Sequence, residues 1–216
     1  MSKYTRPDFL SAALVTIDMQ QDTLDGQPIE IPGTSAILPT LKSLLQSFRE
    51  AGRSIVHMIR MYLPDGSNVD PCRRELVEQG AQMLLAGSNG CAIASELLPD
   101  QAPDLDISLL LSGQVQHVGL HEVVIYKPRW GAFYQTPLEA YLREQQISTL
   151  VFSGCNFPNC PRTSIYEASE RDFRVVLVED AMSGMYERGK EELGRIGIAI
   201  ASAEEVQDRL MQGVLV

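Results

Sequence analysis

Short apolar runs alternate with longer amphipathic stretches along this chain. Each short run ends at polar or turn residues, which predicts strands that are buried on both faces. Those strands are expected at 12–17, 54–59, 122–126, 149–153 and 175–178. Helices are expected at 35–50, 73–85, 137–145, 161–171 and 187–201, and the turn-rich stretch 86–106 is expected to be a long excursion. Strands that alternate with helices predict an α/β fold, with a mainly parallel sheet covered by helices on both faces.

The composition is that of one acidic globular domain over residues 1–216. The 216 residues include 18 Lys+Arg and 28 Asp+Glu, for a net charge of −10, and 44% of them are hydrophobic. That balance disfavours binding to duplex nucleic acid or to an anionic membrane, since both attract basic surfaces. No apolar stretch is long enough to span a bilayer, and no repeat or linker divides the chain. We therefore expect a cytoplasmic protein whose four cysteines are free thiols.

Three polar residues fall where such a sheet binds ligands, outside the C-terminal ends of its strands. Asp18 and Lys127 each follow a predicted strand, and Cys160 precedes Pro161 at the start of a predicted helix. A helix N-terminus favours a thiolate and offers backbone N–H groups to an oxyanion. The aspartate is a suitable base for the thiol, and the lysine offsets the negative charge. The alternative is a cysteine that packs as a small apolar residue, with solvated charges at the strand ends.

Three segments carry these residues, and a fourth accompanies them: LVTIDMQQDTL (14–24), VIYKPRWGAF (124–133), GCNFPNCPRTSIYEASERDFRVVLVEDAMS (154–183) and GSNGCAIASELLP (87–99). In this order and separation they resemble the isochorismatase-like cysteine hydrolases. The resemblance implies a three-layer α-β-α sandwich and amide hydrolysis without a cofactor. It implies Cys160 as nucleophile, Asp18 as general base and Lys127 as positioning cation. It also implies a cis peptide at Cys155–Asn156, with the Asn156 and Cys160 N–H groups forming an oxyanion hole and Cys155 packing beside it.

Several positions depart from the family pattern and leave the substrate open. Thr23 stands where the family often has Phe, Gly131 replaces a Ser, Pro161 replaces Val, and Ser164 replaces Thr. Aromatic side chains near the triad are expected to line a pocket for a flat substrate, and an arginine to grip a carboxylate. The candidate substrate-binding residues are Gln20, Arg129, Trp130, Phe133, Phe157 and Arg162.

No metal site is expected, although the nicotinamidase branch of the family carries one. That branch uses an Asp-x-His motif with a further His after the second strand, whereas residues 61–72 contain no histidine. His57 lies within a predicted strand and is expected to be a hydrogen-bonded core residue. His117 and His121 are four residues apart with Gly119 between them, outside any helical pattern, so neither is expected to bind a metal.

Other functions stay open at this point. One is hydrolysis of an isochorismate-type vinyl ether, which in the family does not depend on the cysteine. A second is a non-catalytic scaffold, although such domains usually lack members of the triad. A third is a redox sensor in which Cys155 and Cys160 form a disulfide. The expected partners are a small amide substrate and, as the family implies, further copies of the chain in a dimer or tetramer.

Overall fold

The structure, a computed structural model, describes residues 2–214 and is built on a seven-stranded sheet of order β3-β4-β2-β1-β5-β6-β7. All neighbouring strands are parallel except β3 and β4, which are antiparallel. The strands are β1 (Ala12–Ile17), β2 (Ser54–Ile59), β3 (Gln116–Gly119), β4 (Glu122–Tyr126), β5 (Thr149–Gly154), β6 (Arg174–Met182) and β7 (Ala199–Ala201). The fold is therefore the mainly parallel α/β sheet that the sequence predicts.

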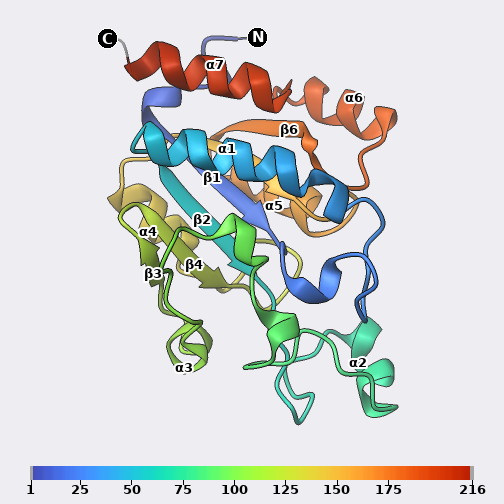
Figure 1. Ribbon diagram of the computed structural model, residues 1–216. Coiled ribbons are helices and arrows are strands. Elements are labelled where there is room, and N and C mark those ends of the chain that lie inside the picture. The colour runs from blue at the N-terminus through green and yellow to red at the C-terminus, as the bar shows by residue number, and fades with distance from the viewer. Residues whose placement is uncertain (1, 215–216) are drawn as a thin grey trace.

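Helices cover both faces of the sheet and complete three layers (Figure 1). One face is packed by α1 (Leu38–Glu50) and α7 (Ala203–Val214), which lie side by side. The other is packed by α4 (Leu138–Glu144), α5 (Cys160–Ser169) and α6 (Glu187–Arg195). Two further helices lie in the connections, α2 (Pro71–Glu78) and α3 (Ile107–Leu111). Among residues 2–214, no helix combines the length and apolarity needed to cross a bilayer.

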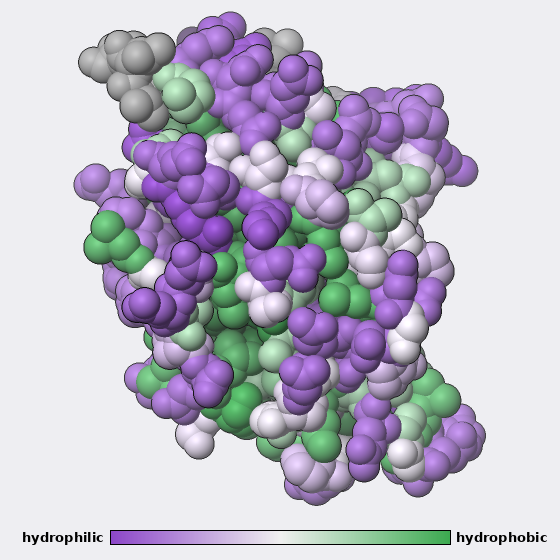
Figure 2. Space-filling view, in the orientation of Figure 1, coloured by the Kyte–Doolittle hydropathy of each residue, from purple (hydrophilic) through white to green (hydrophobic). Residues whose placement is uncertain are grey.

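Two large apolar clusters, one on each face of the sheet, form most of the core. Successive residues of β1 alternate between them, with Leu14 in the α1 and α7 cluster and Val15 in the α4, α5 and α6 cluster. Every residue of β1 is buried, as expected for a central parallel strand. Figure 2 shows hydrophilic side chains around the rim of the α1 face and hydrophobic ones gathered toward its centre.

The chain after β6 differs from the sequence-based expectation. The helix predicted over 187–201 was wrong at its end: α6 stops at Arg195, Gly197 adopts φ 88°, and the apolar residues that follow form β7 at the sheet edge. Glycine accepts this left-handed conformation without a side-chain clash, so the chain turns from helix to strand there. The sequence pattern also missed the short elements α3 and β3.

Four neighbouring parallel strands end at the same edge of the sheet. Asp18, Arg60 and Lys127 directly follow β1, β2 and β4, and β5 ends at Gly154. Gly154 has φ 114°, and a Cβ atom there would lie 2.3 Å from the Ile17 carbonyl oxygen. Only glycine fits this close approach of β5 to β1. The edge is where ligands bind in open α/β sheets.

Candidate active site

Asp18 and Lys127 form a buried ion pair at this edge. The Lys127 Nζ donates to Asp18 Oδ2 at 3.0 Å, and the side chains are 0% and 9% exposed. Lys127 Nζ also lies 3.3 Å from the Arg129 carbonyl oxygen. Asp18 adopts φ 51°, a conformation that Asp tolerates better than most residues, and the chain leaves the strand there. The other carboxylate oxygen, Asp18 Oδ1, is buried and without a partner, so it is free to accept a proton.

Cys160 is the first residue of α5 and neighbours this pair, as the sequence predicts. Its thiol is buried, and Pro161 occupies the first turn of the helix, where a missing N–H costs nothing. Burial, reinforced by the negative charge of Asp18, raises the pKa of the Cys160 thiol to about 12, although Lys127 and Arg60 oppose the rise. The helix N-terminus favours a thiolate, but it does not decide the protonation state of Cys160. Burial and Asp18 outweigh the helix dipole, so the resting group is a thiol.

The loop between β5 and α5 presents two free backbone donors beside the thiol. The Cys155–Asn156 peptide is cis, as the family resemblance implies. Phe157 N–H donates to the Ser183 carbonyl at 2.8 Å. Within residues 2–214, neither Asn156 N–H nor Cys160 N–H has a hydrogen-bond partner, which leaves both available to an incoming oxygen.

Cys155 takes a packing position, as expected. Its side chain is 1% exposed and its thiol donates to the Asp18 carbonyl oxygen at 3.2 Å. Burial raises the pKa of this thiol far above its ordinary value. All four cysteines are free, and Cys72 is the exposed one.

Three of the predicted substrate-binding residues lie elsewhere. Phe133 packs against Phe173 at 5.9 Å, beside the start of β6 and hence at the opposite end of the parallel strands from the triad. Phe157 is 0% exposed and meets the ring of Tyr186 edge-on at 5.2 Å. Arg162 points to α6, where it pairs with Glu192 and donates to Tyr186. Each of these three side chains therefore contacts a partner outside the triad.

Gln20 is also a structural residue. Its side chain is 0% exposed, and its amide nitrogen donates to the carbonyl oxygens of Arg60 and Cys91 at 2.8 and 2.6 Å. Its amide oxygen accepts from the Arg60 N–H at 2.9 Å. Both amide N–H donors are therefore used in hydrogen bonds that join the segment after β1 to the end of β2 and to the 89–91 turn.

Arg129 and Trp130 do lie at the site edge, in a cluster that the sequence-based prediction missed. Two guanidinium groups lie close to the Trp130 ring, with Arg60 Cζ 5.7 Å and Arg73 Cζ 4.9 Å from its centre. Arg129 Nε lies 3.9 Å from Asp70 Oδ1. The same rule that selected Asp18 and Lys127 applies to Arg60, which follows an apolar strand, so the signal was present in the sequence.

Asp70 and Tyr62 hold this cationic cluster together. Asp70 Oδ2 accepts from Arg60 and from the Tyr62 hydroxyl, the latter at 2.7 Å, and Arg73 donates to Tyr62 at 3.0 Å. Burial alone would raise the pKa of Asp70, but Arg60, Tyr62 and Arg73 bring it below its usual range. Burial raises the pKa of Tyr62 to about 12, so the phenol stays neutral and donates. Asp70 is thus a charged anchor for the arginines.

The predicted role of His57 is confirmed. The ring is 1% exposed, with Nδ1 2.7 Å from Thr16 Oγ1 and Nε2 2.7 Å from Glu122 Oε1. Arg49 completes the network through Glu122. These groups lie along the strands and away from the C-terminal edge, so they brace the sheet.

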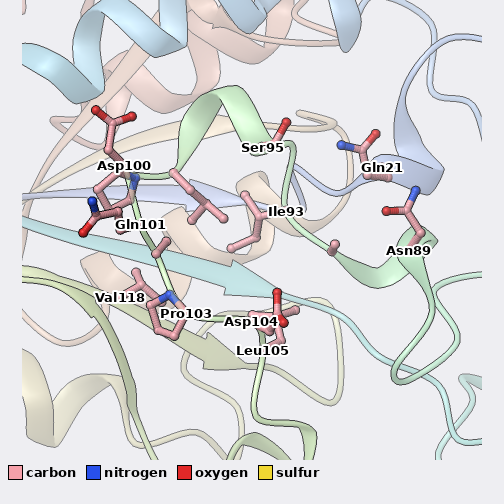
Figure 3. A pocket seen from close by; sticks show the side chains of 14 residues that line it. Gln21, Asn89, Ile93, Ser95, Asp100, Gln101, Pro103, Asp104, Leu105 and Val118 are labelled. Carbon is pink, nitrogen blue, oxygen red and sulfur yellow. The ribbon is translucent and has the colours of Figure 1, made fainter.

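A separate groove of about 490 Å³ opens beside the 89–105 segment. Figure 3 shows Ile93, Pro103 and Leu105 on its wall, with Asp100 and Asp104 among its polar groups. None of the three triad residues lines it. The chemistry-bearing groups are therefore at the sheet edge and not in this groove.

The fold and the site together define a class: α/β proteins with a cysteine at a helix start and an acid–lysine pair at the carboxyl edge of a parallel sheet. An isochorismatase domain model matches residues 111–196, which include Lys127 and Cys160. The structure of an isochorismatase family protein from Desulfovibrio vulgaris superposes with a TM-score of 0.79 at 29% identity, over 93% of this chain and 98% of that one. The chain is therefore similar to the isochorismatase family in sequence over residues 111–196 and in fold over most of its length.

Two sequence relatives differ in whether their names assign them an activity. A maleamate amidohydrolase from Pseudomonas putida is 29% identical over 178 residues, which are 79% of this chain and 71% of the relative. A probable inactive nicotinamidase from Arabidopsis thaliana is 24% identical over 174 residues, 79% of this chain and 80% of the relative. Since the relatives include a named hydrolase and a probable inactive protein, an activity for this chain has to be argued from its own site.

Proposed function

We propose that this protein hydrolyses the C–N bond of a small amide through Cys160, Asp18 and Lys127. The observation that carries the proposal is the buried pair of Lys127 and Asp18 at 3.0 Å, whose second carboxylate oxygen is unpartnered and whose charge acts on the Cys160 thiol. A structural ion pair needs no free oxygen next to a cysteine, whereas a general base does. The amidohydrolase among the relatives supports the same reaction class.

The first half of the reaction forms a thioester. Asp18 Oδ1 takes the thiol proton as the sulfur of Cys160 attacks the amide carbon, so the thiolate exists only while substrate is present. The carbonyl oxygen becomes an oxyanion and accepts from the N–H groups of Asn156 and Cys160. Asp18 then passes its proton to the nitrogen, the C–N bond breaks, and ammonia or an amine departs.

The second half releases the acid. Asp18 takes a proton from water, and the resulting hydroxide attacks the thioester carbon with the oxyanion held by the same donors. The C–S bond breaks, sulfur regains the proton, and the carboxylic acid leaves. Lys127 keeps Asp18 oriented in both halves and offsets the negative charge that passes between carboxylate and sulfur.

Substitution of the nucleophile tests this function. Amide, carbamate and ureide libraries would be screened for ammonia release with the wild-type chain, with Cys160→Ala and with the control Cys72→Ala. Cys72 is exposed and is not a member of the triad, so its loss should leave turnover unchanged. Cys160→Ala should fall to the background rate with an unchanged melting temperature, and wild-type enzyme quenched in acid should carry an acyl group on Cys160 by mass spectrometry. Undiminished turnover in Cys160→Ala would refute the mechanism.

A further inference from the structure

Arg60 is a buried arginine with most of its donors unpaired. It is 2% exposed, yet its Nε and Nη1 atoms have no hydrogen-bond partner, and only Nη2 is bound, to Tyr62 and Asp70. Nε carries one N–H and Nη1 two, so three of the five guanidinium donors are unused. Leaving such donors of a buried cation without an acceptor is costly, so a buried guanidinium normally has its acceptors in place. Within residues 2–214, no protein group supplies an acceptor to Nε or Nη1.

Arg60 lies beside the triad. It follows β2, which is flanked in the sheet by β1 and β4, the strands that end at Asp18 and Lys127. Lys127 N–H donates to the carbonyl oxygen of Ile59, which places Lys127 level with Arg60. Met58, two residues before Arg60, faces the cluster that contains Cys160, and side chains two apart on a strand share a face. Its guanidinium accordingly lies near Trp130, which packs against that cluster.

The charge at this edge is positive although the whole chain carries −10. The contacts join the cations Arg60, Arg73, Arg129 and Lys127 to two carboxylates, those of Asp18 and Asp70. Two positive charges therefore remain uncompensated within the cluster. Arg60 and Lys127 are the buried members of this excess, and around buried charges an excess of cations favours an anion far more than it would in water.

We propose that Arg60 binds a carboxylate of the substrate, so that the substrate is a short carboxylic acid bearing an amide. The presence of an amide in the substrate rests on the proposed hydrolysis, whereas the presence of a carboxylate rests on Arg60. The guanidinium supplies charge-assisted donors to the carboxylate, and the face of Trp130 supports the carbon chain between the two groups. Because neighbouring strands are about 4.8 Å apart, the two functional groups are separated by only a few bonds.

Asp70 and Tyr62 set the direction of this binding. They occupy Nη2 and so hold the guanidinium with Nε and Nη1 unpaired. Arg162 was a sequence-based candidate for binding a substrate carboxylate. In the structure it is already paired with Glu192. It therefore serves as a matched arginine outside the site.

A binding experiment separates this proposal from the catalytic one. Trp130 is the single tryptophan of the chain, so intrinsic fluorescence reports on the side chain that touches Arg60. The Cys160→Ala protein would be titrated with monoamides of two- to six-carbon dicarboxylic acids and with the corresponding neutral diamides. The same titrations would use Cys160→Ala combined with Arg60→Gln, Arg60→Lys or Arg162→Gln, with the fold of each checked by circular dichroism and melting.

The expected result is that at least one monoamide binds at least 10-fold more tightly than its diamide. Arg60→Gln should weaken that binding by about 10- to 100-fold, the range for losing hydrogen bonds to a charged group. Arg60→Lys should recover part of the lost affinity, and Arg162→Gln should change the affinity less than 2-fold. The affinity for the diamides should not depend on Arg60. A series with no preference for the carboxylate, or a preference that survives Arg60→Gln in a folded protein, would overturn the proposal.

The two proposals fail in different ways. Carboxylate binding that depends on Arg60, without ammonia release by the wild-type chain, would refute the hydrolase and retain the anion site. Turnover of neutral amides alone, undiminished by Arg60→Gln, would retain the hydrolase and refute the anion site.

Discussion

Asp18→Asn should have opposite effects on the two reactions of Cys160. Hydrolysis should fall, because the variant has no base to take the thiol proton, a loss of about 100- to 10,000-fold. Alkylation of the same sulfur should become faster, because the carboxylate charge is one of the causes that hold the pKa of Cys160 at about 12. A cysteine that merely packs in the core would show no such divergence.

The size of the second effect follows from the thiol pKa. A pKa of about 12 leaves only about 1 part in 100,000 as thiolate at pH 7, against about 3% for an ordinary thiol near 8.5. Two charges about 4 Å apart interact by about 4 kcal/mol at an effective dielectric constant of 20. Removing one therefore increases the thiolate fraction by up to about 1000-fold. Burial, the largest cause, persists in the variant, so the sulfur stays less reactive than Cys72.

Site-resolved mass spectrometry after timed exposure to iodoacetamide measures this effect, with Cys72 as the internal reference. Between pH 7 and 10 the wild-type rate at Cys160 should rise about tenfold per pH unit, because the thiolate fraction does so below the pKa. Loss of one partner of a buried ion pair costs about 3–5 kcal/mol, so unfolding is monitored in parallel. Glu122→Gln is the control, since it removes a buried carboxylate at the other end of β4. Unchanged or slower alkylation of folded Asp18→Asn would refute the electrostatic reasoning.

Two further predictions concern stability. The ion pair with Arg49 and the hydrogen bond to His57 outweigh burial and lower the pKa of Glu122 from 4.5 to about 2, so its contribution of about 3 kcal/mol is present above pH 4.5 and disappears as the pH falls toward 2. Urea unfolding of Glu122→Gln should show that deficit at pH 7 and little at pH 2.5, and an equal deficit at both would contradict it. Gly131→Ala should cost about 1–3 kcal/mol, because a Cβ there would lie 2.2 Å from Glu167 Oε2, which accepts from Phe133 N–H. In a Glu167→Ala background the same change should cost almost nothing, and an undiminished cost in that double-mutant cycle would show that Glu167 is not the obstacle.

The Gly131–Glu167 contact also explains one departure from the family pattern. The family has Ser where this chain has Gly131, and the carboxylate of Glu167 on α5 fills the space a side chain would need. The substitution is therefore matched by packing from another element. The sequence shows the glycine but not the residue that occupies its space.

Local sequence was enough for most of the fold and for the triad. Central parallel strands are apolar throughout, so their runs are visible in sequence, and the residue after each run falls at the ligand-binding edge. Asp18 and Lys127 could be chosen on that basis. The rule would also have chosen Arg60, but a lone arginine after a strand shows its importance only when its missing partners are known. The end of the helix predicted over 187–201 was wrong for a different reason. A short apolar run such as 196–202 suits both a helix and an edge strand, so the sequence does not separate the two.

Tertiary structure decided which side chains point into the site and in which protonation state. Phe133, Phe157 and Arg162 lie within a few residues of the triad, yet two loops and a helix carry their side chains to other partners. The thiol pKa depends on burial and on a carboxylate 142 positions earlier in the chain, which outweigh the local helix dipole. Sequence thus determined which groups reach the carboxyl edge of the sheet. Only packing, which sets direction, desolvation and the distances between charges, determined what those groups can do there.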